Sequence, residues 1–457
     1  GIAKRWTKPD LSGDVTDLPS QSGDQAGSLL SWGVTDTGYD SVTLTDPAGD
    51  PAHPDSTVFQ AFDLLKVSPI SYSADPLLRW DAVSRVELFR GGAWTTVPAP
   101  AGGWMNATGF VGYTLTPAQT ADTTGVRITV VPNDAARAAA TDPTAPPAGS
   151  GVATVAFGQS RPIGLVWQLR NVQRVPVDPA HPWVAEGTTG PVDNVAQADG
   201  GKGGVPVPPV TGHDTVTLID QPPAVSLTKS SSRSTIVVPH LGDVDPADYP
   251  TNTFTLTAQN TSTSRASYVR VTDPSPCDSG AETACLSGAG AWGADPFSGA
   301  SYSASSPFER LDLTRIAFAV PTGQVDLDAT QVTLWHRAAD GSTSTTVVSM
   351  RATSALTPAD LADVVGVSVV YQGTSPQTTG GTIASGQTLT MTLDTRVRAV
   401  TRTSGAAVTA FRIDNHGFTQ GYDPVLFPSG QGSQPFASAD ASLTLTTGAL
   451  GVTAGKT

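Results

Sequence analysis

The chain has 457 residues, enough for about two to four domains, and its 40 acidic against 26 basic residues leave a formal net charge of −14. Nucleic acid and anionic membrane surfaces both require a basic face, so this charge argues against either as a partner. Only 14% of the residues are charged, and no apolar run reaches the ~18–20 residues of a membrane span. A long disordered polyelectrolyte and a membrane insertion of this segment are therefore not expected.

Short β-strands are expected along the whole chain, which holds 46 Gly and 37 Pro. Nearly all of its acid is Asp, a residue of turns rather than helices. Residues 253–258 and 388–393 alternate Thr with apolar residues, the pattern of a half-buried strand. One short helix or turn is expected at 357–363, and Pro/Gly-rich loops at 141–151 and 200–212. The predicted fold class is all-β, with tandem immunoglobulin-like β-sandwich units.

An internal repeat organises the chain. Matching segments keep their order in the two halves: Val42–Pro47 with Val269–Pro274, Val83–Arg90 with Thr330–Arg337, Leu115–Ala118 with Leu356–Ala359, and Val192–Asn194 with Ile413–Asn415. Lys4 and Lys229 stand at equivalent positions 225 residues apart, at the ends of the matched segments Ile2–Lys4 and Val225–Lys229. The segment Val452–Lys456 is a third copy of this match. We therefore predict two copies of one unit and the start of a third, as in a longer tandem array.

Each unit is too long for one seven-stranded sandwich of ~100 residues. Its two ends look like an immunoglobulin-type sheet, and its middle starts with its own Phe/Leu/Asp-rich strand. We therefore predict a second β-sandwich inserted into the first; the alternative is a single large sandwich with long excursions. The predicted first unit is 1–224 (1–57 plus 173–224, insert 58–172), the second is 225–450 (225–305 plus 397–450, insert 306–396), and 451–457 starts a third unit.

The two cysteines, Cys277 and Cys285, lie eight positions apart in a Ser/Gly-rich stretch. This spacing favours a small disulfide-closed loop formed in an oxidising compartment. The alternative is two free thiols. A metal site is not expected, because it would need further Cys or His residues nearby.

A lysine, an aspartate and an asparagine recur in both units. These residues are Lys4, Asp46 and Asn194 in the first unit, and Lys229, Asp273 and Asn415 in the second. A lysine buried away from water loses its proton, and the neutral amine can attack an Asn carboxamide while a protonated carboxyl assists. The residue types therefore suit an isopeptide bond between the first and last strands of each unit, formed once and without a cofactor. Trp6 and Phe254 are candidates for the apolar surroundings that the lysines need.

The run "VSLTKS … TFTLTAQNTS … YVRVTDP … IDN" resembles the repeat domains of Gram-positive, especially actinobacterial, cell-wall surface proteins and fimbrial subunits. The second unit matches over about 225–275 and 411–420. The first matches less well, because Thr35-Asp36-Thr37 stands where the second has Gln259-Asn260-Thr261. The resemblance implies immunoglobulin-like, often isopeptide-forming domains related to collagen-adhesin modules. It also implies lysines as crosslinking amines, asparagines as acceptors and aspartates as assisting acids.

The function expected is therefore structural: a stalk of an extracellular bacterial protein at the cell wall or cell surface, whose partners are neighbouring repeats of the same protein. The alternative is an adhesin module that binds a host protein or a glycan, which would show exposed apolar or aromatic patches on the inserts. An enzyme is not expected, because it would need a deep pocket with convergent polar groups.

Two assignments stay open at the level of residues. Asp193 and Asp414 adjoin the asparagines and could replace them as acceptors in the crosslink. Asp residues at 46, 50 and 55, and again at 243, 245 and 248, could bind Ca²⁺, but they lack EF-hand spacing and also suit turns.

Overall fold

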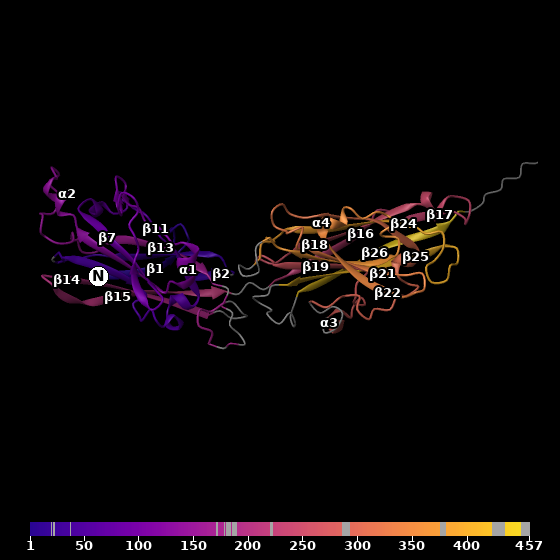
Figure 1. The fold of residues 1–457 in the computed structure, drawn as a ribbon, viewed down its shortest axis with the longest axis horizontal. Helices are drawn as coiled ribbons and strands as arrows, with labels where there is room; N and C mark the ends of the chain where they lie inside the picture. Colours follow the sequence, from indigo (N-terminus) through magenta and orange to yellow (C-terminus); the bar gives the residue numbers. More distant parts are fainter. Residues whose placement is uncertain are drawn as a thin grey trace, which may run out of the picture. The chain divides into compact units, whose positions relative to one another are not determined.

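A computed structural model describes residues 1–19, 21, 23–36, 38–170, 172–177, 179, 184, 190–219, 223–285, 293–374, 381–422 and 435–448. The chain divides into two compact units, Gly1–Asp220 and Gln221–Thr457 (Figure 1). The predicted units were 1–224 and 225–450. The predicted start of a third unit, 451–457, lies outside the described residues.

The first unit contains two short helices and fifteen strands among its described residues. The helices are α1 (Pro117–Asp122) and α2 (Asp134–Ala138). The strands are β1 (Ile2–Thr7), β2 (Asp17–Pro19), β3 (Gln25–Trp32), β4 (Ser41–Asp46), β5 (Phe62–Val67), β6 (Ile70–Ser71), β7 (Asp81–Arg90), β8 (Ala93–Thr96), β9 (Met105–Asn106), β10 (Gly109–Phe110), β11 (Tyr113–Thr114), β12 (Gly125–Pro132), β13 (Arg161–Leu169), β14 (Gly190–Lys202) and β15 (Val205–Ile219).

The second unit is built in the same way. Its helices are α3 (Glu282–Cys285) and α4 (Met350–Thr353). Its strands are β16 (Val225–Ser231), β17 (Thr235–Val238), β18 (Thr251–Asn260), β19 (Tyr268–Asp273), β20 (Leu311–Ala319), β21 (Gln331–Arg337), β22 (Thr343–Ser349), β23 (Val364–Gln372), β24 (Thr388–Val397), β25 (Phe411–Tyr422) and β26 (Phe436–Thr447).

Both units have two main sheets with the same strand order. In the first unit the orders are β1-β3-β13-β5-β11 and β2-β15-β14-β4-β12-β7-β8. In the second they are β16-β18-β24-β20 and β17-β26-β25-β19-β23-β21-β22. Each strand of the second unit therefore has a counterpart in the first, which adds β11 and a small sheet of order β6-β10-β9. The predicted all-β sandwich architecture is confirmed.

The inserted second sandwich is a wrong prediction. The middle segments, 58–172 and 306–396, contribute strands to both main sheets of their units. In the first unit β13 pairs with β3, and β12 pairs with β4. The alternative, a single large sandwich with long excursions, describes each unit. Local patterns did not show this, because they say nothing about which distant strand a strand will pair with.

Alternating burial explains why these sequences form paired strands around a core. In β18 the apolar side chains of Phe254, Leu256 and Ala258 are buried, while the threonines between them are partly exposed. β-branched threonine favours extended backbone, so it suits the outer face. The predicted strands at 253–258 and 388–393 lie in β18 and β24, which pair antiparallel. One continuous apolar core fills each unit.

The predicted loop at 200–212 is wrong, because these residues belong to the long hairpin of β14 and β15. Gly203 and Gly204 both have positive φ and form its two-residue turn, between the paired Lys202 and Val205. The prolines that suggested a loop lie in β15, which pairs with β2 only at its far end, residues 217–219. Proline is tolerated on such an unpaired edge, because its missing N–H would face solvent.

The described residues contain no helix long and apolar enough to cross a membrane.

Candidate functional site

In the first unit the predicted lysine, aspartate and asparagine lie together inside the sandwich. Lys4 on β1 forms an ion pair with the Oδ2 atom of Asp46, at the end of β4. Asn194 on β14 is fully buried and lies near the same carboxyl group. Among the described residues, its carboxamide oxygen has no hydrogen-bond partner, while its nitrogen has the Asp46 carboxyl beside it. A buried carboxamide oxygen without a partner is costly, so the position calls for a chemical explanation.

The second unit repeats the arrangement. Lys229 Nζ on β16 lies 2.9 Å from Asp273 Oδ1 on β19. Asn415 Nδ2 on β25 donates a hydrogen bond of 3.2 Å to the other oxygen, Asp273 Oδ2. All three side chains are buried. One carboxyl group thus faces the amine with one oxygen and the carboxamide with the other.

The packing of the two sheets brings the lysine, aspartate and asparagine together. The lysine strands, β1 and β16, lie at the edge of one sheet, whereas the Asp and Asn strands are neighbours in the other sheet. A long lysine side chain spans the space between the sheets. Lys229 reaches the facing strand, because a Cβ atom added at Gly417 would lie 3.4 Å from its Nζ. Gly417 is two residues from Asn415, so both face the same side of β25.

An aromatic ring lies close to the amine of each lysine. Lys4 Nζ lies 5.9 Å from the ring centroid of Trp167, and Lys229 Nζ lies 5.8 Å from that of Phe254. Phe254 therefore forms part of the apolar surroundings of Lys229, as predicted. Trp6 packs beside the lysine site rather than facing Lys4, with its ring centroid 6.4 Å from that of Trp167. Each lysine side chain is thus buried, with an apolar ring beside its amine.

Burial sets the charges of the first site. Desolvation lowers the pKa of Lys4 and raises the pKa of Asp46, although their mutual attraction opposes both changes. Desolvation likewise lowers the pKa of Lys229. These shifts favour a neutral amine, which is the nucleophilic form of lysine.

The alternative acceptors face the other way. Asp193 has a half-exposed side chain that lies 3.3 Å from His213. Asp414 is two-thirds exposed and pairs with Arg412 at 2.9 Å. Successive side chains of a strand point to opposite faces, so each aspartate is turned outward where its neighbouring asparagine is turned inward. The structure brings together Lys, Asp and Asn, and keeps Asp193 and Asp414 apart from them.

Three of the six Asp residues considered for Ca²⁺ make contacts within the local structure. Asp46 is buried against Lys4, while Asp50 accepts a hydrogen bond from the Ala52 amide and contacts His53. Asp245 caps a short 3₁₀ helix at the Ala247 amide. Within the described ranges, no group of three or more His, Cys, Asp or Glu side chains could hold a metal ion.

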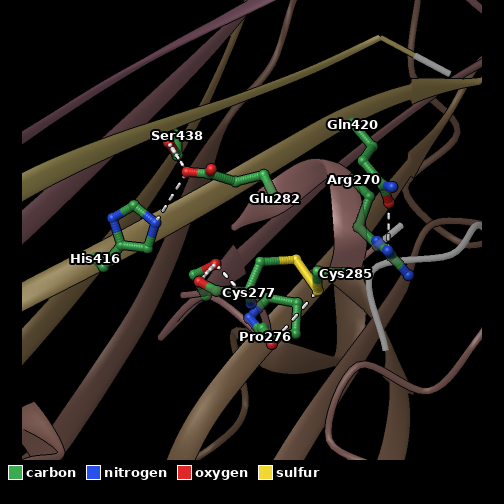
Figure 2. Close-up of a disulfide and its surroundings, with 9 residues drawn as sticks. Arg270, Pro276, Cys277, Glu282, Cys285, His416, Gln420 and Ser438 are labelled. Atoms are coloured by element: carbon green, nitrogen blue, oxygen red, sulfur yellow. Dashed lines mark hydrogen bonds and ion pairs between the residues drawn. A yellow bond between two sulfur atoms is a disulfide. The ribbon is translucent and has the colours of Figure 1, made fainter. Parts of the chain in front are cut away.

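The predicted disulfide between Cys277 and Cys285 is present, with the two Cα atoms 5.5 Å apart. It closes a loop in the connection between β19 and β20, which is much longer than the corresponding connection between β4 and β5. The loop directs Glu282 towards the hairpin of β25 and β26 (Figure 2), where it accepts a hydrogen bond of 2.8 Å from Ser438 and lies 3.7 Å from His416. A cavity of about 400 Å³ beside the loop is lined by residues including Tyr302, Trp335 and His416.

Sequence reasoning missed a second repeated cluster, a carboxylate held by two arginines. Asp63 on β5 accepts hydrogen bonds of 2.5 Å from Arg170 and Arg174. In the second unit Asp312 on β20 accepts hydrogen bonds from Arg398 and Arg402 in the same way. The signal was available, because both arginine pairs are spaced four residues apart and each aspartate lies in the Phe/Leu/Asp-rich strand that starts the middle segment of its unit. The clusters anchor the chain that leaves β13 and β24.

No family model and no curated protein matches this sequence. Among solved structures, the chain is similar to the C-terminal domain of the Streptococcus pyogenes antigen I/II-family protein AspA, with 9% identity and a TM-score of 0.24 over 98% of this chain and 99% of that one. It is also similar to the full-length major pilin SpaD from Corynebacterium diphtheriae, with 8% identity and a TM-score of 0.23 over 89% of this chain and 61% of that one. A third is BcpA, the major pilin subunit of Bacillus cereus, with 8% identity and a TM-score of 0.25 over 56% of each chain.

Proposed function

We propose that this protein is a structural segment of an extracellular bacterial stalk, and that each unit is closed by an internal Lys–Asn isopeptide bond. The observation that supports the proposal most is the buried Lys–Asp–Asn triad, which occurs at equivalent strands of both units. A structural role alone does not explain the triads, because a buried charged pair is a weak source of stability. A covalent bond would convert the buried amine and the buried carboxamide into a single neutral amide.

The geometry of the second unit supports a specific sequence of proton transfers. Neutral Lys229 Nζ attacks Cγ of Asn415, so that the Nζ–Cγ bond forms and the Cγ–Nδ2 bond breaks. The protonated form of Asp273 gives a proton from Oδ2 to Nδ2, which that oxygen already contacts, while Oδ1 takes the surplus proton from Nζ. Ammonia leaves, and Asp273 returns to its starting state. The step needs no cofactor and occurs once per unit.

Intact mass spectrometry tests the proposal directly. The folded chain is expected to weigh two ammonia molecules less than its sequence, after correction for the disulfide. The Lys229→Ala variant should lack one ammonia loss, and Asp273→Ala should also lack it although both reactants remain. Replacing the exposed Lys202 by Ala is the matched control and should leave both losses in place. A wild-type mass with no ammonia lost would show that the units rest on ordinary packing.

A second candidate, recognition of a host protein or glycan, is favoured by the long connection between β19 and β20. The second unit carries this disulfide-closed excursion and the cavity beside it. If it binds a ligand, replacing 274–306 by the short first-unit segment 47–57 should abolish binding to arrays of glycans and matrix proteins. Binding that the replacement leaves unchanged would contradict this candidate function. If the parent chain binds nothing on the arrays, only the structural role remains.

A further inference from the structure

The two asparagines proposed as acceptors of the crosslinks do not lie on the last strand of their units. Asn194 is on β14, and β15 follows it through the hairpin turn at Gly203 and Gly204. Asn415 is on β25, and β26 follows it. The expectation of a bond between first and last strands is therefore corrected: the acceptor strand is the last but one in both units.

This placement decides which part of each unit feels tension. A bond from Lys4 to Asn194 closes a covalent loop over everything between them. Tension that enters before Lys4 crosses this bond and leaves along the chain after Asn194. The strands inside the loop are relieved of load, but residues 195–219 are not. In the second unit, residues after Asn415 are loaded in the same way.

We infer that the last strand of each unit, β15 or β26, is a built-in extensible arm that yields under tension while the rest of the unit stays folded. The inference rests on the proposed function, because without the crosslinks the whole unit would be loaded. It concerns a mechanical property that the crosslinks alone do not imply.

The hairpin geometry favours stepwise opening. Asn194 is paired with Asp214, and the chain leaves the unit at the same open end of the hairpin, beyond Ile219. Force applied there separates the pairs one after another from the open end towards the Gly203–Gly204 turn. Stepwise opening loads few hydrogen bonds at a time, so it needs less force than simultaneous rupture.

Specific contacts latch the arm at rest. In the first unit Asp214 Oδ2 accepts a hydrogen bond of 2.6 Å from the backbone amide of Trp6 on β1. Residues 217–219 pair in parallel with β2, and Val216 and Leu218 are buried in the core. In the second unit, residues 444–447 pair in parallel with β17.

The register places a different residue at the position of the second unit that corresponds to Asp214. Asn194 pairs with Asp214, whereas Asn415 pairs with Ala441. A carboxylate is therefore replaced by a methyl group at the corresponding position. Changing Asp214 should alter the arm of the first unit only.

Single-molecule force spectroscopy of the full chain, held by handles at both ends, tests the inference. At ~3.4 Å per residue, release of 195–219 adds about 8 nm of contour and release of 416–448 adds about 11 nm. The wild-type chain should show these two short events and no event with a larger gain in contour length. In Lys229→Ala, which opens the loop from 229 to 415, a further event of about 60 nm should appear.

Two variants assign the short event of the first unit. Asp214→Ala should lower its force, while Asp142→Ala, an exposed position inside the loop, should not. An added disulfide in the double variant Asp193→Cys/Thr215→Cys should abolish the event until it is reduced, because these two positions are paired and share a hydrogen bond. The native disulfide lies inside the second loop, so its reduction should change nothing.

The outcomes separate this inference from the proposed function. Crosslinks detected by mass spectrometry together with no short events would overturn the extensible arm and leave the crosslinked stalk standing. Long events in wild type would show that the loops are open, and would overturn both.

Discussion

At the scale of single residues, the two lysines define what is unusual about this protein. Lys4 and Lys229 each lie buried beside an aromatic ring, a carboxyl group and a carboxamide. Desolvation lowers the pKa of both lysines. The same burial that makes these residues poor contributors to stability makes them reactive towards each other.

A variant that cannot crosslink should show how the buried pair responds to pH. In the Asn194→Ala variant, the lowered pKa of Lys4 gives a contribution to the free energy of unfolding that is lost as the pH falls through the folded-state pKa. The raised pKa of Asp46 gives one that is lost as pH rises through its folded value. The two slopes have opposite signs and offset each other across neutral pH, because the proton that burial disfavours on Lys4 is the one that burial favours on Asp46. Stability from this pair should therefore vary little across neutral pH.

Calorimetry of the first unit's unfolding transition across pH measures this effect. The control is the triple variant Asn194→Ala/Lys4→Met/Asp46→Leu, which removes both titrating groups. The difference between the two curves isolates the pair. A difference that slopes steadily between pH 5 and pH 9 would contradict the shared-proton account.

At the scale of elements, the repeated arginine cluster holds the chain after β24 against β20. Replacing Asp312 by Ala leaves two partly buried arginines without this carboxylate. We expect a loss of about 1–3 kcal/mol in the unfolding free energy of the second unit, because hydrogen bonds to charged groups are lost in a partly shielded site.

The matched control is Asp328→Ala in the same unit. Asp328 also pairs with an arginine, Arg351, but both side chains are more than 60% exposed. An exposed pair contributes little, so the control should cost less than ~1 kcal/mol. Chemical denaturation of both variants compares the two sites, and equal losses would show that the cluster is no more than a surface ion pair.

At the scale of the whole molecule, two closed loops should make the units independently resistant to unfolding. In the loop-entropy model a long crosslinked loop stabilises by ~4–5 kcal/mol. Lys4→Ala should therefore lower the melting temperature of the first unit alone, and Lys229→Ala that of the second alone. Differential scanning calorimetry should resolve the shifted transition from the unchanged one.

Reducing agent provides an independent check on the source of this stability. An isopeptide bond is not reducible, so breaking the disulfide of Cys277 and Cys285 should leave the first unit unchanged and shift the second only slightly. A collapse of both transitions on reduction would contradict the crosslinked design.

The sequence already contained the repeat, the strand faces and the chemistry of the triad. Period-two alternation placed Phe254, Leu256 and Ala258 on one face, and the repeated spacing selected Lys4, Asp46 and Asn194 with their counterparts. These are local or register-like properties, so they can be recognised without knowing the fold. The spacing of Cys277 and Cys285 was likewise enough to predict their bond.

Only the tertiary structure decided how the strands pair. The middle segments joined the two main sheets rather than forming a second sandwich, because hydrogen bonding between distant strands has no local signature. The same pairing turned 200–212 into half of a hairpin and so moved Asn194 from the last strand to the last but one. It also turned Asp193 and Asp414 outward. The sequence alone thus determined which groups could react, while the folding of both sheets around them determined which groups meet and which strand is left to bear the load.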